Sequence, residues 1–251
     1  MTTESALIRA CRQCHDIVER YLDSKDGDLR SRGQAQVKRS LAIVKDALGK
    51  HDMSEIAVSF NGGKDCQVML IIFMAALYSE MDTRPTLLDG FDRLRCIYVH
   101  VNNSFEEVDK FVDDCKSQYA LEVVRLPPPL KEAFDHYLGL HENIRAILVG
   151  IRRTDPYGSK LSYYEKTDHG WPEFMRVHPV LEWHYVEIWD FLLFTEVPYC
   201  PLYDQGYTSL GGTKNTCKNP TLERLDSHGN IIFRPAYELE DDDKERLSRI
   251  T

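Results

Sequence analysis

The feature that most constrains the fold is a regular alternation of short apolar runs with helical stretches between residues 55 and 151. Runs typical of buried strands lie at residues 55–60, 95–101, 121–126 and 146–151. Stretches with helical spacing of apolar positions fill the intervals, at residues 65–79, 105–119 and 131–140. Because parallel strands need crossover helices between them, this order predicts an α/β fold. We expect a mostly parallel, twisted sheet with helices on both faces.

Two further parts flank this core. Residues 4–24 and 34–49 have helical spacing, and the polar stretch between them reads as a connection. After residue 151 the chain becomes rich in turns, apart from a helical run at residues 182–194. We therefore expect residues 1–151 to form the N-terminal helices and the α/β core. Residues 152–251 should form a loop-rich C-terminal extension that packs on the core in one compact unit.

Charge and composition exclude several classes of protein. With 31 basic and 40 acidic residues, the net charge of −9 disfavours a nucleic-acid surface, which needs clustered Lys and Arg. The longest apolar run is too short to span a membrane, and the N-terminus lacks a signal-peptide core, so a cytoplasmic location is expected. The seven scattered cysteines fit free thiols. Cys11 and Cys14, followed by His15, have a metal or heme spacing, but on a helix without a second ligand pair they are interpreted as structural.

A glycine pair separates the first strand from an apolar helix, in the segment SFNGGKDC, Ser59–Cys66. Glycines let the backbone approach an anion, and the N-terminus of a helix attracts phosphate. Lys64 adds a positive charge, Asn61 can donate a hydrogen bond, and Asp65 can orient a metal ion. The adjacent glycines do not fit the Walker A pattern. The alternative is an ordinary turn between a strand and a helix.

The segment GIRRTDP, Gly150–Pro156, begins where the fourth strand ends. Ligands of open α/β sheets bind at that edge. Arg152 and Arg153 can hold phosphates, and Asp155 can bind Mg²⁺ or orient a reacting group. The alternative is a surface pair of arginine and aspartate in a loop.

Two later segments carry candidate ligand contacts. Within Lys166–Trp183, Asp168 and Arg176 flank Trp171, Phe174 and Met175, a set that suits a planar heterocycle with a phosphate tail. The alternative is that these aromatic side chains pack beneath the loop. In the C-terminal segment DDDKERLSRIT, two arginines three positions apart share a helical face, Arg246 and Arg249. The alternative there is a solvated, charged terminus.

SFNGGKDC resembles the pyrophosphate loop S-G-G-K-D-S of the adenine-nucleotide α-hydrolases. The added Phe60-Asn61 and the final Cys66 resemble the branch shared by PAPS reductases and eukaryotic FAD synthetases. T-D-x-x-W-P-x-F-M-R resembles the flavin-binding motif of FAD synthetases, and D-x-x-x-E-R-x-x-R resembles their C-terminal pattern. Sulfonucleotide reductases need a nucleophilic cysteine near the C-terminus, and no cysteine follows Cys217.

The resemblance implies an FMN adenylyltransferase that uses Mg²⁺, takes ATP and FMN as substrates, and releases FAD and pyrophosphate. It implies catalytic roles for Asn61, Asp65, Asp155 and Arg246. It implies an ATP site of Ser59, Phe60, Asn61, Gly62, Gly63, Lys64, Val99, Ile151, Arg152 and Arg246. It implies a flavin site of Asp168, Trp171, Phe174, Met175, Arg176 and Arg249, and a Mg²⁺ site of Asp65 and Asp155. A monomer that passes FAD to apo-flavoproteins is expected. The alternatives are a relative that binds PAPS or APS, and a flavin- or nucleotide-binding module without catalysis.

Overall fold

A six-stranded sheet forms the centre of the computed structural model, which describes residues 4–25 and 27–250. Residues 1–3, 26 and 251, which belong to the two predicted parts, lie outside this description. The sheet order is β3-β2-β1-β4-β6-β5, and only β5 runs antiparallel to its neighbour. The strands are β1 Ile56–Ser59, β2 Leu94–Val99, β3 Leu121–Leu126, β4 Ala146–Val149, β5 Tyr164–Lys166 and β6 Met175–Val177. The predicted mostly parallel α/β fold is confirmed.

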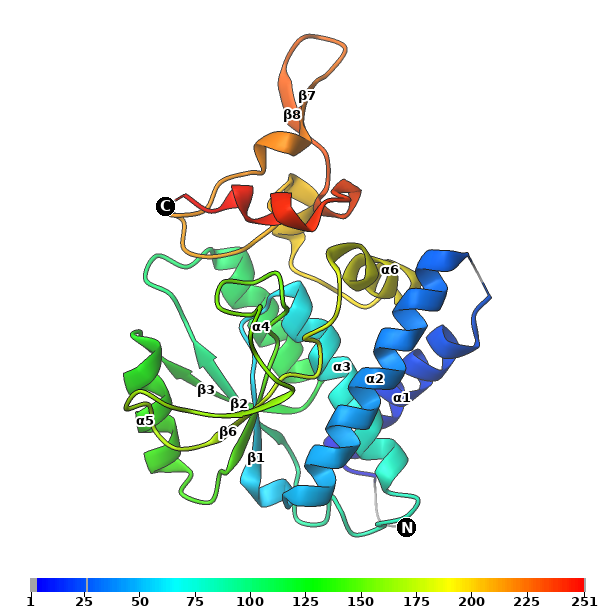
Figure 1. Cartoon of the computed structure of the whole chain (residues 1–251), viewed down its shortest axis with the longest axis vertical. Coiled ribbons are helices and arrows are strands. Elements are labelled where there is room, and N and C mark those ends of the chain that lie inside the picture. Colours follow the sequence, from blue (N-terminus) through cyan, green and yellow to red (C-terminus); the bar gives the residue numbers. More distant parts are fainter. Residues whose placement is uncertain (1–3, 26, 251) are drawn as a thin grey trace.

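Helices cover both faces of the sheet, as Figure 1 shows. They are α1 Ala6–Asp23, α2 Asp28–Lys50, α3 Lys64–Glu80, α4 Glu106–Gln118, α5 Leu130–Leu140 and α6 Tyr185–Thr195. Successive strand residues point to opposite faces. Accordingly, Ile56 and Val58 of β1 join the large core around α3, whereas Ala57 joins a smaller core with Phe134 of α5. The predicted helices are present, but α2 begins at Asp28 rather than at residue 34, so much of the stretch predicted as a connection is helical.

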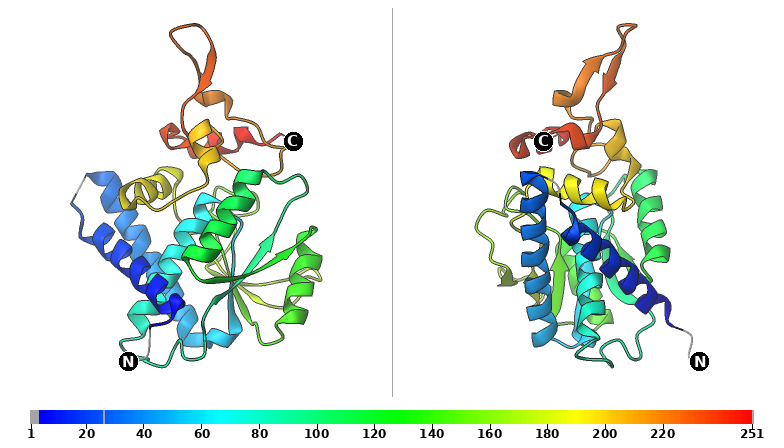
Figure 2. Two further views of the ribbon diagram at one scale, coloured as in Figure 1. Left: turned by 180° about the vertical axis from the view of Figure 1, so that it is seen from behind. Right: turned by 90° about the vertical axis from the view of Figure 1, so that its right-hand side faces the viewer.

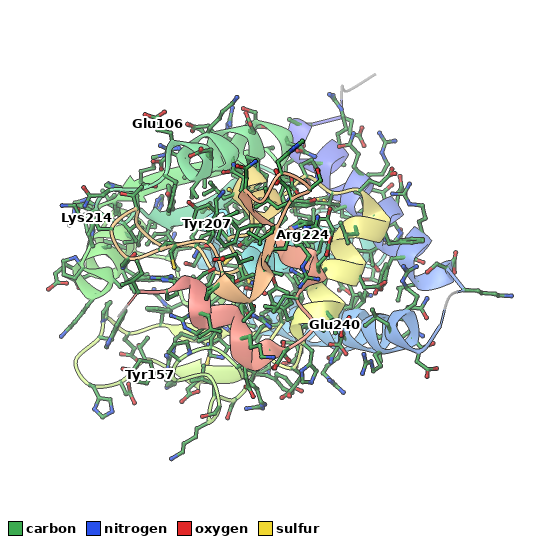
Figure 3. All side chains as sticks on the ribbon, turned by 90° about the horizontal axis from the view of Figure 1, so that it is seen from above. Glu106, Tyr157, Tyr207, Lys214, Arg224 and Glu240 are labelled. Carbon is green, nitrogen blue, oxygen red and sulfur yellow. The ribbon has the colours of Figure 1, made fainter. Side chains whose placement is uncertain are left out.

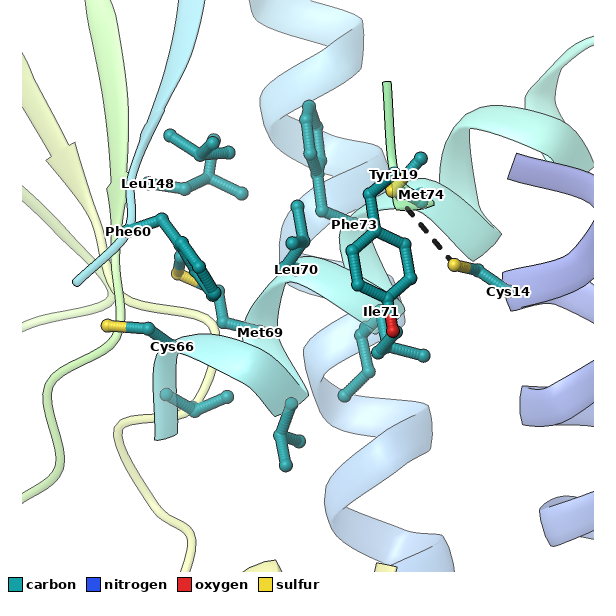
Figure 4. Close-up of a cluster of buried hydrophobic side chains, with 14 of the residues drawn as sticks. Cys14, Phe60, Cys66, Met69, Leu70, Ile71, Phe73, Met74, Tyr119 and Leu148 are labelled. Atoms are coloured by element: carbon teal, nitrogen blue, oxygen red, sulfur yellow. Dashed lines mark hydrogen bonds between the residues drawn. The ribbon is translucent and has the colours of Figure 1, made fainter. Parts of the chain in front are cut away.

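Helix α3 is buried on nearly every side because it is apolar nearly all round. Figure 4 shows its residues Met69, Leu70 and Phe73 among the buried side chains. The thiol of Cys14 on α1 lies 3.9 Å from the sulfur of Met74 in this core. Burial raises the pKa of the Cys11 thiol to about 12 and raises that of Cys14 as well. Both thiols therefore stay neutral and serve as packing groups.

Strands β5 and β6 of the predicted C-terminal extension belong to the central sheet, whereas the segment from about residue 200 onward lies over the ends of the strands and consists mostly of loops and short 3-10 helices (Figures 1 and 2). The 3-10 helices of this part are η2 Pro201–Gln205, η3 Pro220–Leu222, η4 Ala236–Glu238 and η5 Asp242–Ser248; a fifth, η1 Met53–Glu55, precedes β1. A hairpin of β7 Glu223–Leu225 and β8 Ile231–Phe233 projects from the molecule (Figure 2). Seen from above, these segments cross the top of the α/β core, with Tyr207 near the middle and Tyr157 and Lys214 nearer the rim (Figure 3).

The core and the C-terminal part share one hydrophobic cluster. Val58 of β1, Trp189 of α6 and Leu239 all belong to it. Strands β5 and β6 fall in a segment predicted as turns, since three-residue strands are too short to show a period of two. Among residues 4–25 and 27–250, no helix is both long and apolar enough to cross a membrane.

Candidate active site

A cavity of about 240 Å³ opens at the carboxyl ends of the central strands. β1 and β4 are neighbours there, while the chain continues from β1 toward β2 and β3 on the other side. Ligands of open α/β sheets bind at such a reversal of strand order. The residues that line the cavity are Asn61, Gly63, Lys64, Asp65, Cys66, Tyr98, Val99, Val101, Ser104, Val108, Gly150, Asp155, Tyr203, Ser209, Leu210, Gly211, Glu245, Arg246 and Arg249.

The loop between β1 and α3 brings the positive end of a 17-residue helix to this cavity. Gly62 has a φ of 74°, a conformation that glycine adopts without strain. The side-chain oxygen of Asn61 accepts a 3.0 Å hydrogen bond from the N–H of Gly63. The N–H of Lys64 donates a 3.0 Å hydrogen bond to the hydroxyl of Tyr203. The loop is therefore fixed from both sides before any ligand binds.

The end of β4 packs directly against this loop. A Cβ atom on Gly150 would lie 2.8 Å from the Cα atom of Cys66, so only glycine fits at this position. Burial raises the pKa of the Cys66 thiol to about 12, and the charge of Asp65 adds to this effect. Cys66 therefore acts as a small packing group beneath the site and carries no charge.

Beside the cavity lies a cluster of four ionised side chains, Lys64, Asp65, Arg152 and Glu245, called here the buried ion cluster. The ammonium of Lys64 lies 2.5 Å from Glu245 and 3.1 Å from Asp65. The guanidinium of Arg152 lies 2.8 Å from Asp65 and also contacts Glu245. Burial alone would lower the pKa of Lys64, but the carboxylates of Asp65 and Glu245 outweigh it and raise that pKa. Asp242 also lies 3.6 Å from the guanidinium of Arg152, so carboxylates surround both cations.

Asp155 stands at the edge of the buried ion cluster. One of its oxygens accepts a 2.9 Å hydrogen bond from the N–H of Arg152, and the other lies 4.0 Å from the guanidinium of Arg246. Burial raises the pKa of Asp155, and repulsion from Asp65 raises it further. A cation or a basic ligand group in the cavity would relieve this cost, because it favours the ionised carboxylate.

Two arginines, Arg246 and Arg249, bring positive charge to the cavity with few carboxylates close by among the described residues. The side chain of Arg246 is 41% exposed, with a single carboxylate oxygen of Asp155 at 4.0 Å. Arg249 donates a 2.8 Å hydrogen bond to the carbonyl oxygen of Leu210, and its guanidinium lies against Gly211. Burial and the neighbouring Arg246 lower the pKa of Arg249. An anionic ligand would therefore be attracted to both.

The structure brings together eight of the residues predicted from the sequence. These eight line the cavity: Asn61, Gly63, Lys64, Asp65, Val99, Asp155, Arg246 and Arg249. Five others predicted for the ATP site lie behind or beside it: Ser59, Phe60, Gly62, Ile151 and Arg152. Phe60 and Arg152 are fully buried, the first in the core and the second in the buried ion cluster.

The residues predicted for the flavin ring lie away from this cavity. Met175 pairs with Ala146 at the start of β4, whereas the cavity lies beyond the end of that strand. Phe174 is 4% exposed and stacks on Phe134 of α5, with ring centroids 5.3 Å apart.

The remaining members of this set are more accessible. The side chain of Asp168 is 64% exposed, and Trp171 is 38% exposed and makes a T-shaped contact with the ring of Phe134. Arg176 on β6 lies 3.9 Å from Glu165. In this structure Phe174 is a packing residue, while Asp168 and Trp171 stand at a surface open to a ligand.

Several lining residues were not predicted. Tyr203 of η2 and the loop segment Ser209–Gly211 belong to no recognisable motif, so no sequence signal marks them. Glu245 had a signal, because it directly precedes Arg246 in the C-terminal pattern of acidic and basic residues. Its partner across the fold, Lys64, lies 181 positions earlier in the chain.

The residues at the cavity fit a magnesium ion only in part. Mg²⁺ is usually held by one or two carboxylates together with substrate phosphates. Asp155 fits this role, since one of its oxygens has no partner closer than 4.0 Å among the described residues. Asp65 fits it poorly, because its two oxygens lie 2.8 Å and 3.1 Å from the cations of Arg152 and Lys64. Within residues 4–25 and 27–250, no three His, Cys, Asp or Glu side chains form a ready metal site.

Comparison with known proteins identifies the family to which the chain belongs. Residues 55–218 match the phosphoadenosine phosphosulfate reductase domain. The chain is 41% identical over 217 residues to a probable FAD synthase of Schizosaccharomyces pombe, covering 86% of this chain and 79% of that protein. It is 39% identical to a probable FAD synthase of Caenorhabditis elegans, covering 83% of this chain but only 39% of that longer protein.

The fold also agrees with crystal structures of Candida glabrata FMN adenylyltransferase. The complex with FMN and the ATP analog AMPCPP has a TM-score of 0.89 at 26% identity, with 96% of each chain covered. The complex with FAD and inorganic pyrophosphate has a TM-score of 0.90, with 98% and 97% covered. The chain therefore belongs to the family of proteins with the phosphoadenosine phosphosulfate reductase domain and, within it, to the FAD synthases, which are nucleotidyltransferases.

Proposed function

We propose that the chain transfers the AMP part of ATP to the 5′-phosphate of FMN, giving FAD and pyrophosphate. The observation that carries this proposal is the cavity itself. It joins the positive end of α3 to Arg246 and Arg249 at the reversal of strand order. That arrangement suits the binding of a triphosphate. The similarity to FAD synthases is the reason for proposing FMN as the second substrate.

The adenosine of ATP would occupy the apolar side of the cavity. Val99, Val101 and Val108 line that side, next to the end of β2. The phosphates would then lie against the first turn of α3 and Asn61, with Arg246 facing them from the C-terminal segment. The FMN phosphate is already an anion near neutral pH, so its attack on the α-phosphorus needs no general base. Positioning and charge neutralisation carry the reaction.

Magnesium is proposed to bind with the phosphates of ATP. Asp155 would give the protein ligand, while Asp65 would hold Arg152 in place beside it. The ion would neutralise the charge that develops on the leaving pyrophosphate. Asn61, Asp65, Asp155 and Arg246 remain the proposed catalytic set.

FMN is proposed to extend outside the cavity. A volume of about 240 Å³ is below the roughly 300–1,000 Å³ typical of pockets that enclose a ligand, so one substrate must lie partly outside it. Arg249 would bind the phosphate of FMN. The flavin ring is proposed to reach the exposed residues Asp168 and Trp171. A single chain supplies all these residues, so a monomer would suffice; its cytoplasmic location and the delivery of FAD to apo-flavoproteins stay predictions.

The test is a chromatographic assay of FAD formation from FMN, ATP and Mg²⁺. Purified protein should form FAD, and Asp155→Ala should lose most of this activity while it keeps the melting temperature of the wild type to within a few degrees. A folded wild-type protein that forms no FAD would contradict the proposal. Binding of PAPS by such a protein would instead favour the sulfonucleotide alternative.

A further inference from the structure

Glu245 occupies an unusual place for a carboxylate. It is 4% exposed, and acidic side chains are rarely buried unless they are paired. Its two oxygens contact the ammonium of Lys64 at 2.5 Å and the guanidinium of Arg152. These partners lie 181 and 93 positions earlier in the chain. Glu245 therefore links the C-terminal segment to both phosphate-binding motifs of the core.

The charges around Lys64 are already balanced without a ligand. Lys64 is 2% exposed, and carboxylates of Asp65 and Glu245 both contact its ammonium. A phosphate that bound this ammonium would have to displace a buried carboxylate. Breaking a buried ion pair on one side is costly, because it leaves an uncompensated charge. The side chain of Lys64 is thus suited to hold the C-terminal segment.

The residue after Glu245 also lines the cavity, but its side chain is far more exposed. Neighbouring residues of a 3-10 helix project about 120° apart. In η5, Glu245 faces the buried ion cluster, and Arg246 lines the cavity with 41% of its side chain exposed. Two further hydrogen bonds hold this turn. The hydroxyl of Thr208 donates to the carbonyl oxygen of Glu245 at 2.6 Å, and the N–H of Thr208 donates to the hydroxyl of Ser248 at 3.0 Å.

We infer that Glu245 is a positioning residue for the transferase reaction. It anchors η5 on Lys64 and Arg152, and this anchoring aims Arg246 at the phosphates of ATP. The side chain of Lys64 acts as an anchor for Glu245 and makes no contact with the leaving pyrophosphate. The inference rests on the proposed function, since the role of Arg246 is defined by ATP.

A double-mutant cycle tests the link between Glu245 and Arg246. Glu245→Gln should lower kcat/KM for ATP by about 100-fold, the size expected when one group that stabilises transition-state charge no longer acts. Arg246→Ala should cause a similar loss in the wild type but little further loss when added to Glu245→Gln, because the misplaced guanidinium no longer contributes. Asp243→Asn removes an exposed carboxylate of the same helix and should leave activity unchanged. Losses that multiply in the double variant would overturn the inference.

A second cycle covers the case in which Glu245→Gln fails to fold. Lys64→Met and Glu245→Leu together remove one cation and one carboxylate of a contacting pair, so the double variant should fold better than Glu245→Leu alone. It should also keep at least about tenfold more activity. If the ammonium of Lys64 bound pyrophosphate, the double variant would be the less active one, and the inference would be wrong. The melting temperatures require no activity, so they test the anchoring of Glu245 on Lys64 even if the wild type forms no FAD; equal melting temperatures for the double variant and Glu245→Leu would contradict that anchoring.

Discussion

The N–H of Lys64 donates a 3.0 Å hydrogen bond to the hydroxyl of Tyr203, which lies 139 positions later in the chain. Lys64 is the first residue of α3, so this N–H is one of the groups that the helix itself cannot satisfy. Tyr203 is fully enclosed, and burial raises the pKa of its phenol. A neutral hydroxyl from the C-terminal part therefore caps the helix end at which the phosphates are proposed to bind.

Tyr203→Phe should destabilise the free protein. The substitution leaves the buried N–H of Lys64 without an acceptor, at a cost of about 1–3 kcal/mol in the free energy of unfolding. Urea denaturation would measure this loss. Tyr199→Phe is the matched control, since its hydroxyl bonds to Asp204 near the surface, and it should cost about 0.5 kcal/mol or less. Equal losses in the two variants would contradict the role of Tyr203.

Gly150→Ala should disturb the site through the backbone. The new methyl group would lie 2.8 Å from the Cα atom of Cys66, so the phosphate loop must move. Overpacking of this kind costs about 1–3 kcal/mol, and FAD formation should fall with it. Gly139→Ala, on α5 with no other heavy atom within 4 Å, should stabilise the protein by about 0.5–1 kcal/mol. An active and stable Gly150→Ala variant would show that the two segments are not tightly packed.

The raised pKa of Asp155 predicts two opposite pH effects. Above its ordinary value of 3.8 the folded protein binds more protons at Asp155 than the unfolded chain does. Stability from this group is therefore present at low pH and is lost as the pH rises through the folded pKa. As the pH rises through the raised pKa of Asp155, the melting temperature of the wild type should fall relative to that of Asp155→Asn.

Activity should change in the other direction with pH. The ionised form of Asp155 is the one proposed to act with Mg²⁺ and ATP, so kcat/KM for ATP should rise as the pH passes the raised pKa. Asp155→Asn keeps an oxygen acceptor for the N–H of Arg152 but should lack this rise. A wild-type stability profile that runs parallel to that of the variant would contradict the assignment.

Asp168→Asn tests the flavin motif apart from the ATP site. Asp168 is exposed, so the substitution should leave stability unchanged. A lost hydrogen bond to a charged group costs about 1.5–3 kcal/mol, so the KM for FMN should rise roughly tenfold or more while the KM for ATP stays the same. Glu173→Gln, in the same loop, is the control. An unchanged KM for FMN would place the flavin elsewhere.

The sheet was predictable because its signal is local. Each of the four strands β1 to β4 appears in the sequence as an apolar run between helices. The strands at residues 56–59 and 121–126 lie within one residue of their predicted positions. Strands β5 and β6 are three residues each and lie among turns, so their pairing depends on contact with β4 rather than on their own sequence. The hairpin of β7 and β8 was not predicted, because its strands are also only three residues long.

The site was predictable only where a motif carried it. The glycine loop, Asp155 and the two C-terminal arginines meet at one cavity. The partners of Lys64 did not follow from its motif, since Glu245 and Tyr203 lie 181 and 139 positions away. Burial also changes the role that a residue can have. A lysine after two glycines suggests a phosphate ligand, but the fold surrounds this one with carboxylates.

The central claim is that the AMP part of ATP enters the flavin product. The most direct test gives the protein FMN and Mg²⁺ with ATP labelled with ³²P at either the α- or the γ-phosphorus. Label from the α-position should appear in FAD, in an amount equal to the pyrophosphate released, and label from the γ-position should appear only in pyrophosphate. Label from the γ-position in the flavin, or no labelled flavin from folded protein, would contradict the account.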